Sequence, residues 1–277
     1  MRNTSIAIAI LTKNEETNIA RCIESHRECG PIYVVDSGSS DNTTAIATSL
    51  GATILFREWT GFADQRNYVI EELRDLHDWI VFIDADEIFD LGAFDFIQSD
   101  LTGTGFDIIY VSQTIYLNGK PLHHAPGYPI YHPRIARTSR ARFVQNQSGH
   151  GEAIDSSRRL KVHYLNIPYK HHITSHGIQQ WLTKHIGLAK LEAFRETKID
   201  DATTRRMRIN ILIPDNLLRP IIRFAYHFLF RQGFRDGREG LIYSAMYAWF
   251  ELTKWIIRCD SELSSGTKAK ATLKDPL

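Results

Sequence analysis

The chain has 277 residues, of which 43% are hydrophobic and 23% are charged, and its formal net charge is +1. This composition is typical of a globular protein with one large domain and an extension, and it excludes a strongly basic nucleic-acid-binding protein. Its 3 cysteines form no CxxC pair, the N-terminal apolar run is too short for a signal peptide, and no apolar run reaches the length of a membrane span. The sequence therefore predicts a cytoplasmic protein with reduced cysteines.

The first part of the chain alternates short apolar, β-branched runs with helical segments. Strand, helix, strand at this spacing predicts an α/β fold with a mostly parallel sheet and right-handed crossovers. We expect strands at 5–11, 32–35, 52–56 and 79–83, and helices at 15–27, 44–50 and 62–73.

From residue 107 the pattern changes. A long strand at 107–117 precedes the turn signal Asn118-Gly119. Short segments at 134–137, 142–144 and 161–164 predict a mixed sheet edge, and 178–197 is helical. We expect a catalytic α/β domain at 1–200 with halves 1–100 and 101–200, a basic helical region at 201–260, and a flexible tail at 261–277.

Polar residues gather where the predicted parallel strands end. Asn14 and Glu15 follow the first strand, Asp36 ends the second and Asp84 follows the fourth. Each residue alone could be a helix N-cap, but ligands of open α/β sheets bind beyond the carboxyl ends of the strands. Three polar clusters at three such ends predict one binding site.

The segment VFIDADE, residues 81–87, places three carboxylates side by side. Adjacent carboxylates repel one another, but they become favourable when Mg²⁺ or Mn²⁺ lies between them and a diphosphate. At a strand end, Asp84 and Asp86 project to the same side and can face one ligand, and we interpret Glu87 as a supporting residue.

The segments AILTKNEE, VVDSGSSDNT, GFADQRN and FIDADE, in this order, resemble the N-terminal half of family 2 glycosyltransferases, which have the GT-A fold. The resemblance implies an inverting transfer from a nucleotide-diphosphate sugar, with Mg²⁺ or Mn²⁺ as cofactor. By position it implies that Thr12, Asn14 and Glu15 contact the nucleotide base and that Asp36 contacts the base or ribose. It also implies that Arg66 contacts the base or diphosphate. Asp84 would contact the ribose and the metal, and Asp86 would be a metal ligand.

Two residues of GFADQRN also have a plainer interpretation. Arg66 lies on a predicted helix and could be a solvated surface charge, and Asn67 could be a buried polar spacer. A guanidinium beside a diphosphate is nevertheless what the charge of such a donor requires.

Inverting transfer needs a general base that deprotonates the acceptor hydroxyl. The segment QSGHGEAID offers Glu152, which we prefer, and also His150 and Asp155. Related enzymes often have adjacent His and Glu here, whereas this chain has His-Gly-Glu, so the choice among the three stays open. A plain β-turn is the alternative, although two glycines beside a histidine favour a ligand-binding loop.

The segment YKHHITSHG carries three histidines. We select His172 as a third metal ligand or diphosphate contact; the alternative is an ordinary polar segment before a helix, which would include His171 and His176. The HxxxH spacing lacks the glutamate of a zinc hydrolase, so that class is excluded.

Two other enzyme classes are excluded at the first strand end. A sugar nucleotidyltransferase or a dinucleotide dehydrogenase needs a glycine-rich loop where this chain has TKNEETN. A non-catalytic, membrane-docked nucleotide-sugar-binding protein stays as the alternative function.

The segment from Arg205 to Arg258 has ten Lys and Arg against four Asp and Glu, interleaved with apolar and aromatic residues. It predicts two amphipathic helices joined near Gly233–Gly237 that bind the cytoplasmic face of the inner membrane. The alternative is a helical hairpin that packs on the catalytic domain or forms a homo-oligomer. Similar family 2 members that build bacterial surface polysaccharide or lipopolysaccharide core carry a comparable basic tail, which implies a lipid-linked glycan acceptor.

Overall fold

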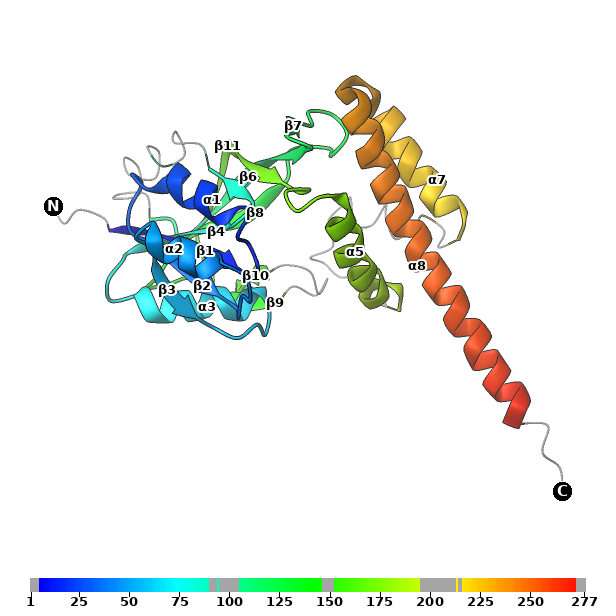
Figure 1. Ribbon diagram of the computed structural model, residues 1–277, viewed down its shortest axis with the longest axis horizontal. Helices are drawn as coiled ribbons and strands as arrows, with labels where there is room; N and C mark the ends of the chain where they lie inside the picture. The colour runs from blue at the N-terminus through cyan, green and yellow to red at the C-terminus, as the bar shows by residue number, and fades with distance from the viewer. Residues whose placement is uncertain are drawn as a thin grey trace. The chain divides into compact units, whose positions relative to one another are not determined.

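Figure 1 shows the computed structural model of the chain, which describes residues 5–89, 94, 105–145, 152–194, 213 and 216–272, with the backbone alone at 152 and 262–272. Two compact units make up the chain. The sheet unit comprises Met1–Pro121 and Pro129–Ser175, and the helical unit comprises Leu122–Tyr128 and His176–Leu277.

The four predicted parallel strands are present. They are β1 (Ile6–Thr12), β2 (Ile32–Asp36), β3 (Thr53–Phe56) and β4 (Trp79–Asp84), in the order β3-β2-β1-β4. The central residues of β1, β2 and β4 are apolar and buried, as in a covered parallel sheet, whereas β3 at the sheet edge is only partly buried. Thr12 pairs with Asp36, and Leu11 pairs with Asp84, so the polar strand ends meet at one edge.

The sheet continues through strands from the second half of the chain. In it, β8 (Tyr131–Arg137) lies antiparallel between β4 and β6 (Ile108–Leu117), and β11 (Val162–His172) runs parallel to β6. The short β5 (Glu87–Ile88) and β7 (Lys120–Pro121) pair with β11 and β6, and β9 (Phe143–Gln145) pairs with β10 (Glu152–Ile154). The predicted mixed pairing is confirmed, but β8 lies inside the sheet rather than at its edge, and β9 belongs to a separate two-stranded sheet with β10.

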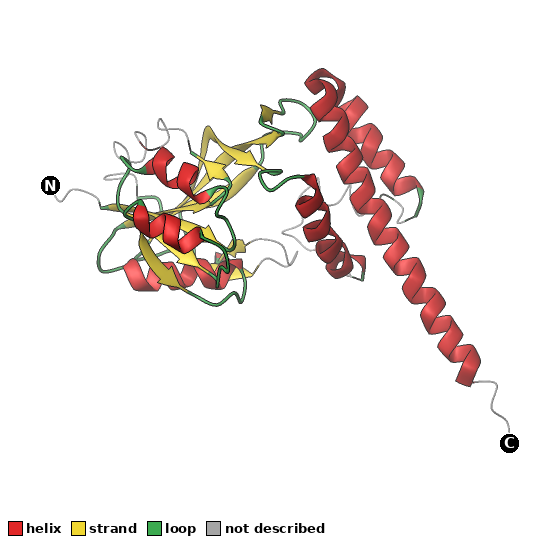
Figure 2. Ribbon diagram, in the orientation of Figure 1, coloured by secondary structure: helices red, strands yellow, loops and turns green. Residues whose placement is uncertain are grey.

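Helices cover both faces of this sheet (Figure 2). On one face, α1 (Ile19–His26) and α2 (Thr43–Ser49) bury residues such as Ile8 and Ile83. On the other, α3 (Phe62–Leu73) and the β9–β10 hairpin bury Phe82. Each such side chain contributes about 1.5–3 kcal/mol by leaving water. We call these the α1 face and the α3 face.

The helical unit contains α5 (Ile178–Ala193), α7 (Leu218–Ala225) and the long α8 (Gly237–Thr272), with a π-helical turn at Tyr226–Phe230 and a 3₁₀ turn at Gly233–Asp236. The predicted pair of helices joined near Gly233–Gly237 is therefore present, and the fold prediction is confirmed. The helical unit begins at His176 rather than near residue 200, because α5 packs against α8 through Trp181 and Trp249.

Candidate active site

The loop after β2 is organised by Asp36. One carboxylate oxygen accepts hydrogen bonds from the backbone N–H groups of Gly38 and Ser39, both at 2.9 Å, and the other accepts from the Ser39 hydroxyl at 2.5 Å and the Thr12 hydroxyl at 3.4 Å. Gly38 has φ +87°, which favours glycine. Asp36 therefore fixes a tight loop at the strand end.

Asn14 and Glu15 join the loop after β1 to the loop after β2. The Asn14 side-chain oxygen accepts from the Ser40 N–H at 2.8 Å, and the Asn14 N–H donates to the Ser39 hydroxyl at 2.8 Å. The Glu15 N–H donates to the Thr43 hydroxyl at 2.8 Å. The predicted residues of the first two strand ends are thus joined by hydrogen bonds into one cluster.

The carboxylates of VFIDADE share a counter-charge that the sequence analysis missed. Arg134 on β8 is 4% exposed, and its guanidinium donates to Asp84 at 3.0 Å, to the fully buried Glu87, and to the Tyr169 hydroxyl at 3.4 Å. Asp84 and Asp86 keep 30% and 25% of their side chains exposed. The two predicted ligand carboxylates are therefore open to a ligand, whereas Glu87 lies beneath them.

The pKa values of Asp84 and Glu87 are shifted in opposite directions. For Asp84, burial favours the neutral form, but the charges of Arg134 and Arg66 outweigh it and hold the pKa well below its usual range. For Glu87, burial outweighs the attraction of Arg134, and the charge of Asp84 adds to it, which raises the pKa to about 7. Asp84 is therefore ionised at neutral pH, whereas Glu87 is partly protonated. The Glu87 carboxyl accepts a hydrogen bond from the Asp84 backbone N–H at 3.1 Å.

Asp86 contacts two consecutive histidines of β11. The His171 Nε2 lies 3.5 Å from the Asp86 carboxylate and its Nδ1 lies 3.0 Å from the Gln113 side-chain oxygen. Burial lowers the pKa of His171, but Asp86 outweighs this, and the net pKa is raised. The His172 backbone N–H donates to the Asp86 carbonyl at 3.0 Å. Both histidines lie at Asp86, and His171 makes the side-chain ion pair.

The His172 ring packs against Tyr116, with ring centroids 4.9 Å apart. Burial and the nearby Arg21 charge lower its pKa, which keeps the imidazole neutral at pH 7. A neutral imidazole is the form that binds metal ions. His176 belongs to the helical unit.

Arg66 is 1% exposed, so it is no solvated helix charge. Its guanidinium lies over the rings of Phe82 and Phe143, at 4.9 and 5.6 Å from their centroids, and donates to the Pro133 carbonyl at 3.5 Å. Its positive charge helps to lower the pKa of the Asp84 carboxyl.

Asn67 holds the β9–β10 hairpin. Its amide donates to the Phe143 carbonyl and accepts from the Phe143 N–H, both at 2.9 Å, as a neighbouring strand would. Gln145 of the same strand pairs with Glu152 on β10. Asn67 is thus both a buried polar contact and the residue that positions the strand opposite Glu152.

The three candidate bases differ in what the structure describes. Glu152 is described by its backbone at the start of β10, and His150 lies outside the described residues. The Asp155 carboxylate accepts from the Ser157 N–H at 3.0 Å and the Ser157 hydroxyl at 2.6 Å, and these bonds lower its pKa. Asp155 therefore caps the 3₁₀ turn at Ser156–Arg158.

In the described part of the chain, no group of three His, Cys, Asp or Glu side chains lies close enough to hold a metal ion. A complete protein-built cage for zinc is therefore absent from this region. Mg²⁺ and Mn²⁺ sites that use one or two carboxylates and complete their shell with phosphate oxygens need no such cage. The half-exposed Asp84 and Asp86 fit a site of that kind.

Comparison with known proteins decides the family. Residues 7–158, more than half of the chain, match the model of glycosyl transferase family 2. The chain belongs to this family. The resemblance of the four motifs is confirmed, and with it the GT-A type of α/β fold.

Among the relatives of this chain, an uncharacterized glycosyltransferase of Rickettsia conorii is 42% identical over 83 residues, which cover 30% of this chain and 29% of the relative. The lipopolysaccharide core biosynthesis glycosyltransferase LpsC of Rhizobium meliloti is 36% identical over 86 residues, covering 29% of this chain and 31% of LpsC. The match thus spans under a third of each. A crystal structure of glucosyl-3-phosphoglycerate synthase from Mycobacterium tuberculosis aligns with a TM-score of 0.45 and 18% identity, covering 61% of this chain and 72% of that one.

Arg134 should be critical for stability because it compensates two carboxylates. We expect Arg134→Leu to lower the free energy of unfolding by about 3 kcal/mol, since a buried charge loses its partner. Adding Glu87→Gln should recover part of that loss by removing one stranded carboxylate. Urea unfolding at pH 7.5, followed by circular dichroism, measures both.

The matched control is Arg142→Leu, which breaks the exposed Arg142–Glu71 ion pair and should change stability little. If Arg134→Leu is as mild as this control, or if Glu87→Gln worsens it, the shared counter-charge is not what holds the two carboxylates together.

Proposed function

We propose that this glycosyltransferase is an inverting, metal-dependent enzyme that transfers a sugar from a nucleotide-diphosphate sugar to a hydroxyl of a lipid-linked glycan, in the biosynthesis of bacterial lipopolysaccharide or another surface polysaccharide. One observation carries the proposal: Asp84 and Asp86 stay half-exposed at a strand end beside the buried cations Arg66 and Arg134. The kinship with LpsC supports the cell-surface role.

The connected loops after β1 and β2 are the proposed site for the nucleoside. Thr12, Asn14, Glu15 and Asp36 lie there, and the loop backbone can contact a base or ribose closely. Arg66 is proposed to attract the diphosphate, because its charge acts on the space in front of Asp84.

Asp84 and Asp86 are the proposed ligands of Mg²⁺ or Mn²⁺, and His172, which the structure does not gather with them into a three-residue metal site, is the proposed diphosphate contact. The two carboxylates suit a hard cation, since both are exposed enough to bind it. When bound, the ion would neutralise charge on the diphosphate leaving group. Glu87 and Arg134 hold the Asp84 carboxylate and backbone in place.

Glu152 is the proposed general base, with His150 as the alternative. The base removes the proton of the acceptor hydroxyl while that oxygen bonds to the anomeric carbon. The bond from this carbon to the diphosphate oxygen breaks, and its electron pair leaves with the nucleoside diphosphate. Attack opposite the leaving group inverts the configuration. Asn67 supports this role because it fixes the strand that pairs with Glu152.

The metal assignment predicts a linked effect on stability. We expect one of UDP, GDP, CDP or dTDP, with Mn²⁺, to raise the melting temperature of the wild type, and EDTA to abolish the rise. Asp86→Ala should fold, lose the Mn²⁺-dependent rise and lose turnover. Asp75→Ala removes an exposed carboxylate of the sheet unit and should behave as the wild type. Full turnover in excess EDTA, or collapse of Asp86→Ala, would refute the assignment.

The base assignment predicts separate effects on binding and chemistry. Glu152→Gln keeps the shape of the side chain and removes its proton affinity, so the nucleotide-dependent melting shift should persist while transfer falls by roughly 10²–10⁴-fold. If Glu152→Gln is as active as the wild type and His150→Ala is not, the base is His150. If the wild type does not even hydrolyse donor sugars slowly with Mn²⁺, the non-catalytic alternative holds.

The membrane part of the proposal rests on the orientation of α7. Its Arg219 and Arg223 donate to Glu251 of α8 at 2.9 and 3.1 Å and are only 14% and 16% exposed in their side chains. In contrast, Leu218 and Ile221 of the same helix are 56% and 65% exposed. A helix on a water-facing surface normally buries its apolar residues and exposes its charged ones. The outer face of α7 is instead apolar, which favours contact with an apolar environment.

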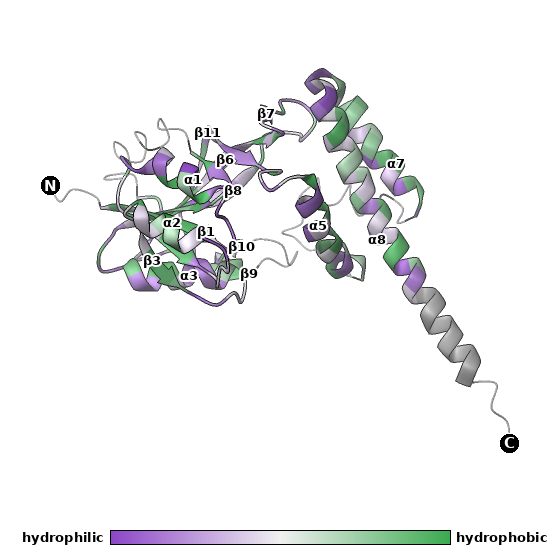
Figure 3. Cartoon of the chain, in the orientation of Figure 1, coloured by the Kyte–Doolittle hydropathy of each residue, from purple (hydrophilic) through white to green (hydrophobic). Residues whose placement is uncertain are grey.

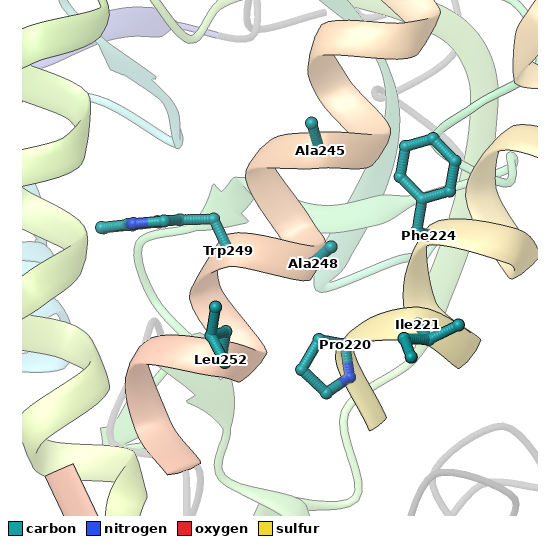
Figure 4. Close-up of a pocket in the computed structure, with 7 residues that line it drawn as sticks. All are labelled: Pro220, Ile221, Phe224, Ala245, Ala248, Trp249 and Leu252. Atoms are coloured by element: carbon teal, nitrogen blue, oxygen red, sulfur yellow. The ribbon is translucent and has the colours of Figure 1, made fainter. Parts of the chain in front are cut away.

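The apolar surface continues between α7 and α8. A hollow of about 410 Å³ there is lined only by apolar residues (Figure 4). Hydrophobic residues run along both helices (Figure 3), and Leu229 and Phe230 in the turn are 60% and 77% exposed. The residues lining the hollow are Pro220, Ile221, Phe224, Ala245, Ala248, Trp249 and Leu252.

None of the helices in the described ranges is long and apolar enough to cross a membrane. The proposed mode is therefore interfacial, on the cytoplasmic face of the inner membrane, with aromatic side chains at headgroup depth and the excess of basic residues near anionic lipid. The same surface could instead join two copies of the chain, which the experiment below separates.

Flotation with vesicles tests this surface. We expect the full chain to float with phosphatidylethanolamine–phosphatidylglycerol vesicles, more weakly as salt rises but without complete loss, because the apolar face remains. Ile221→Glu and Phe230→Glu together should abolish flotation, whereas Leu76→Glu, at a residue of the sheet unit that is 63% exposed, should not. If the wild type ignores vesicles and the double variant only dissociates an oligomer in sedimentation, the surface is a subunit interface.

A further inference from the structure

Three tyrosines from three neighbouring strands gather on the sheet. They are Tyr110 on β6, Tyr131 on β8 and Tyr164 on β11. The rings of Tyr110 and Tyr164 lie 5.2 Å apart at 29°, and Tyr131 meets Tyr164 edge-on at 5.2 Å and 82°. Tyr164 is 58% exposed and the other two are half-buried. We call these residues the tyrosine platform.

The platform lies on the α3 face of the sheet. Tyr110 packs against the core cluster that contains Phe82 and Phe143, the two rings that flank Arg66. Ile154 of β10 packs against the same cluster. The tyrosines therefore share a face with Arg66 and with the hairpin that carries Glu152.

The strand register places the platform near Asp84. Val81 of β4 pairs with Ile135 of β8, so Asp84 lies at about the level of His132, and His132 pairs with Val111, the neighbour of Tyr110. Two inter-strand spacings separate β4 from β6, which is about 10 Å. The charges of Asp84 and Arg66 both act on His132, which agrees with this placement.

The chemistry of the platform fits a sugar ring. A pyranose has an apolar face of C–H groups that packs on an aromatic ring, and a rim of hydroxyls that bonds to phenolic oxygens, each of which both donates and accepts. A tyrosine supplies both kinds of contact with few rotatable bonds to order. An acyl chain would not use the hydroxyls, and an exposed aromatic cluster on a sheet is otherwise costly in water.

We propose that the tyrosine platform binds a pyranose ring of the glycan acceptor, by stacking on Tyr164 with hydrogen bonds from Tyr110 and Tyr131. That this sugar belongs to the acceptor rests on the proposed function. The distance of about 10 Å between the platform and the level of Asp84 leaves room for the transferred sugar. The acceptor therefore presents to the enzyme a sugar ring with one apolar face.

Saturation-transfer NMR on the full chain tests the platform, with the methyl pyranosides of glucose, galactose and mannose as probes. At least one should receive saturation on the C–H groups of a single ring face. Tyr164→Ala should weaken this binding about tenfold, and Tyr164→Trp should retain it. Leu76→Ala changes an equally exposed apolar residue of the sheet unit, 63% against 58%, and should have no effect.

The platform is refuted if no pyranoside binds the wild type, or if Tyr164→Ala binds as the wild type does. The Mn²⁺-dependent melting shift with a nucleoside diphosphate, measured on the same variants, separates the two proposals. A Tyr164-dependent pyranoside signal without that shift keeps the sugar site and refutes the donor site. A normal shift in Tyr164→Ala with no pyranoside binding in any variant refutes the platform alone.

Discussion

The arrangement of this site depends on one buried guanidinium. Asp84 ends β4 and Glu87 begins β5 three residues later, and burying both without a counter-charge would cost several kcal/mol. Arg134 meets both, and it comes from β8, which lies antiparallel between β4 and β6. The carboxylates that the first half of the chain supplies are therefore stable only when a strand from the second half is in register. The site is therefore complete only in the assembled sheet.

The same dependence explains what the sequence could and could not predict. Strands β1 to β4 follow from local sequence, because each is a short apolar run, and the polar ends of β1, β2 and β4 follow with them. Arg134 gives no local signal, since a single arginine in a short β segment is ordinary until its pairing partner is known. The sequence predicts only the start of β11, because its later residues Lys170, His171 and His172 are polar and give no strand pattern. Strand alternation, invisible without the pairing, presents His171 to the Asp86 carboxylate.

The helical unit shows a related limit. The periodicity of α7 indicates an amphipathic helix, but periodicity does not say which face is inward. Glu251, on α8, decides this by drawing Arg219 and Arg223 inward together with Lys254. A short amphipathic helix that looks ordinary in sequence thereby becomes one with an apolar exterior. Likewise, α5 belongs with α8 through the ring contacts of Trp181 with Trp249 and of His185 with Phe250, which no spacing along the chain reveals.

One helix connects the two halves of the proposed chemistry. Arg66 and Asn67 are neighbours on α3, and consecutive residues on a helix point about 100° apart. Arg66 therefore reaches the rings beside the carboxylates while Asn67 reaches the backbone of β9, the partner strand of Glu152. Because α3 packs on the sheet through Val69, Ile70 and Leu73, it acts as a rigid spacer between the leaving-group side and the base side. The tyrosine platform lies on the same face, so the proposed Arg66, base and acceptor contacts all lie on the face of the sheet that α3 and the β9–β10 strands cover.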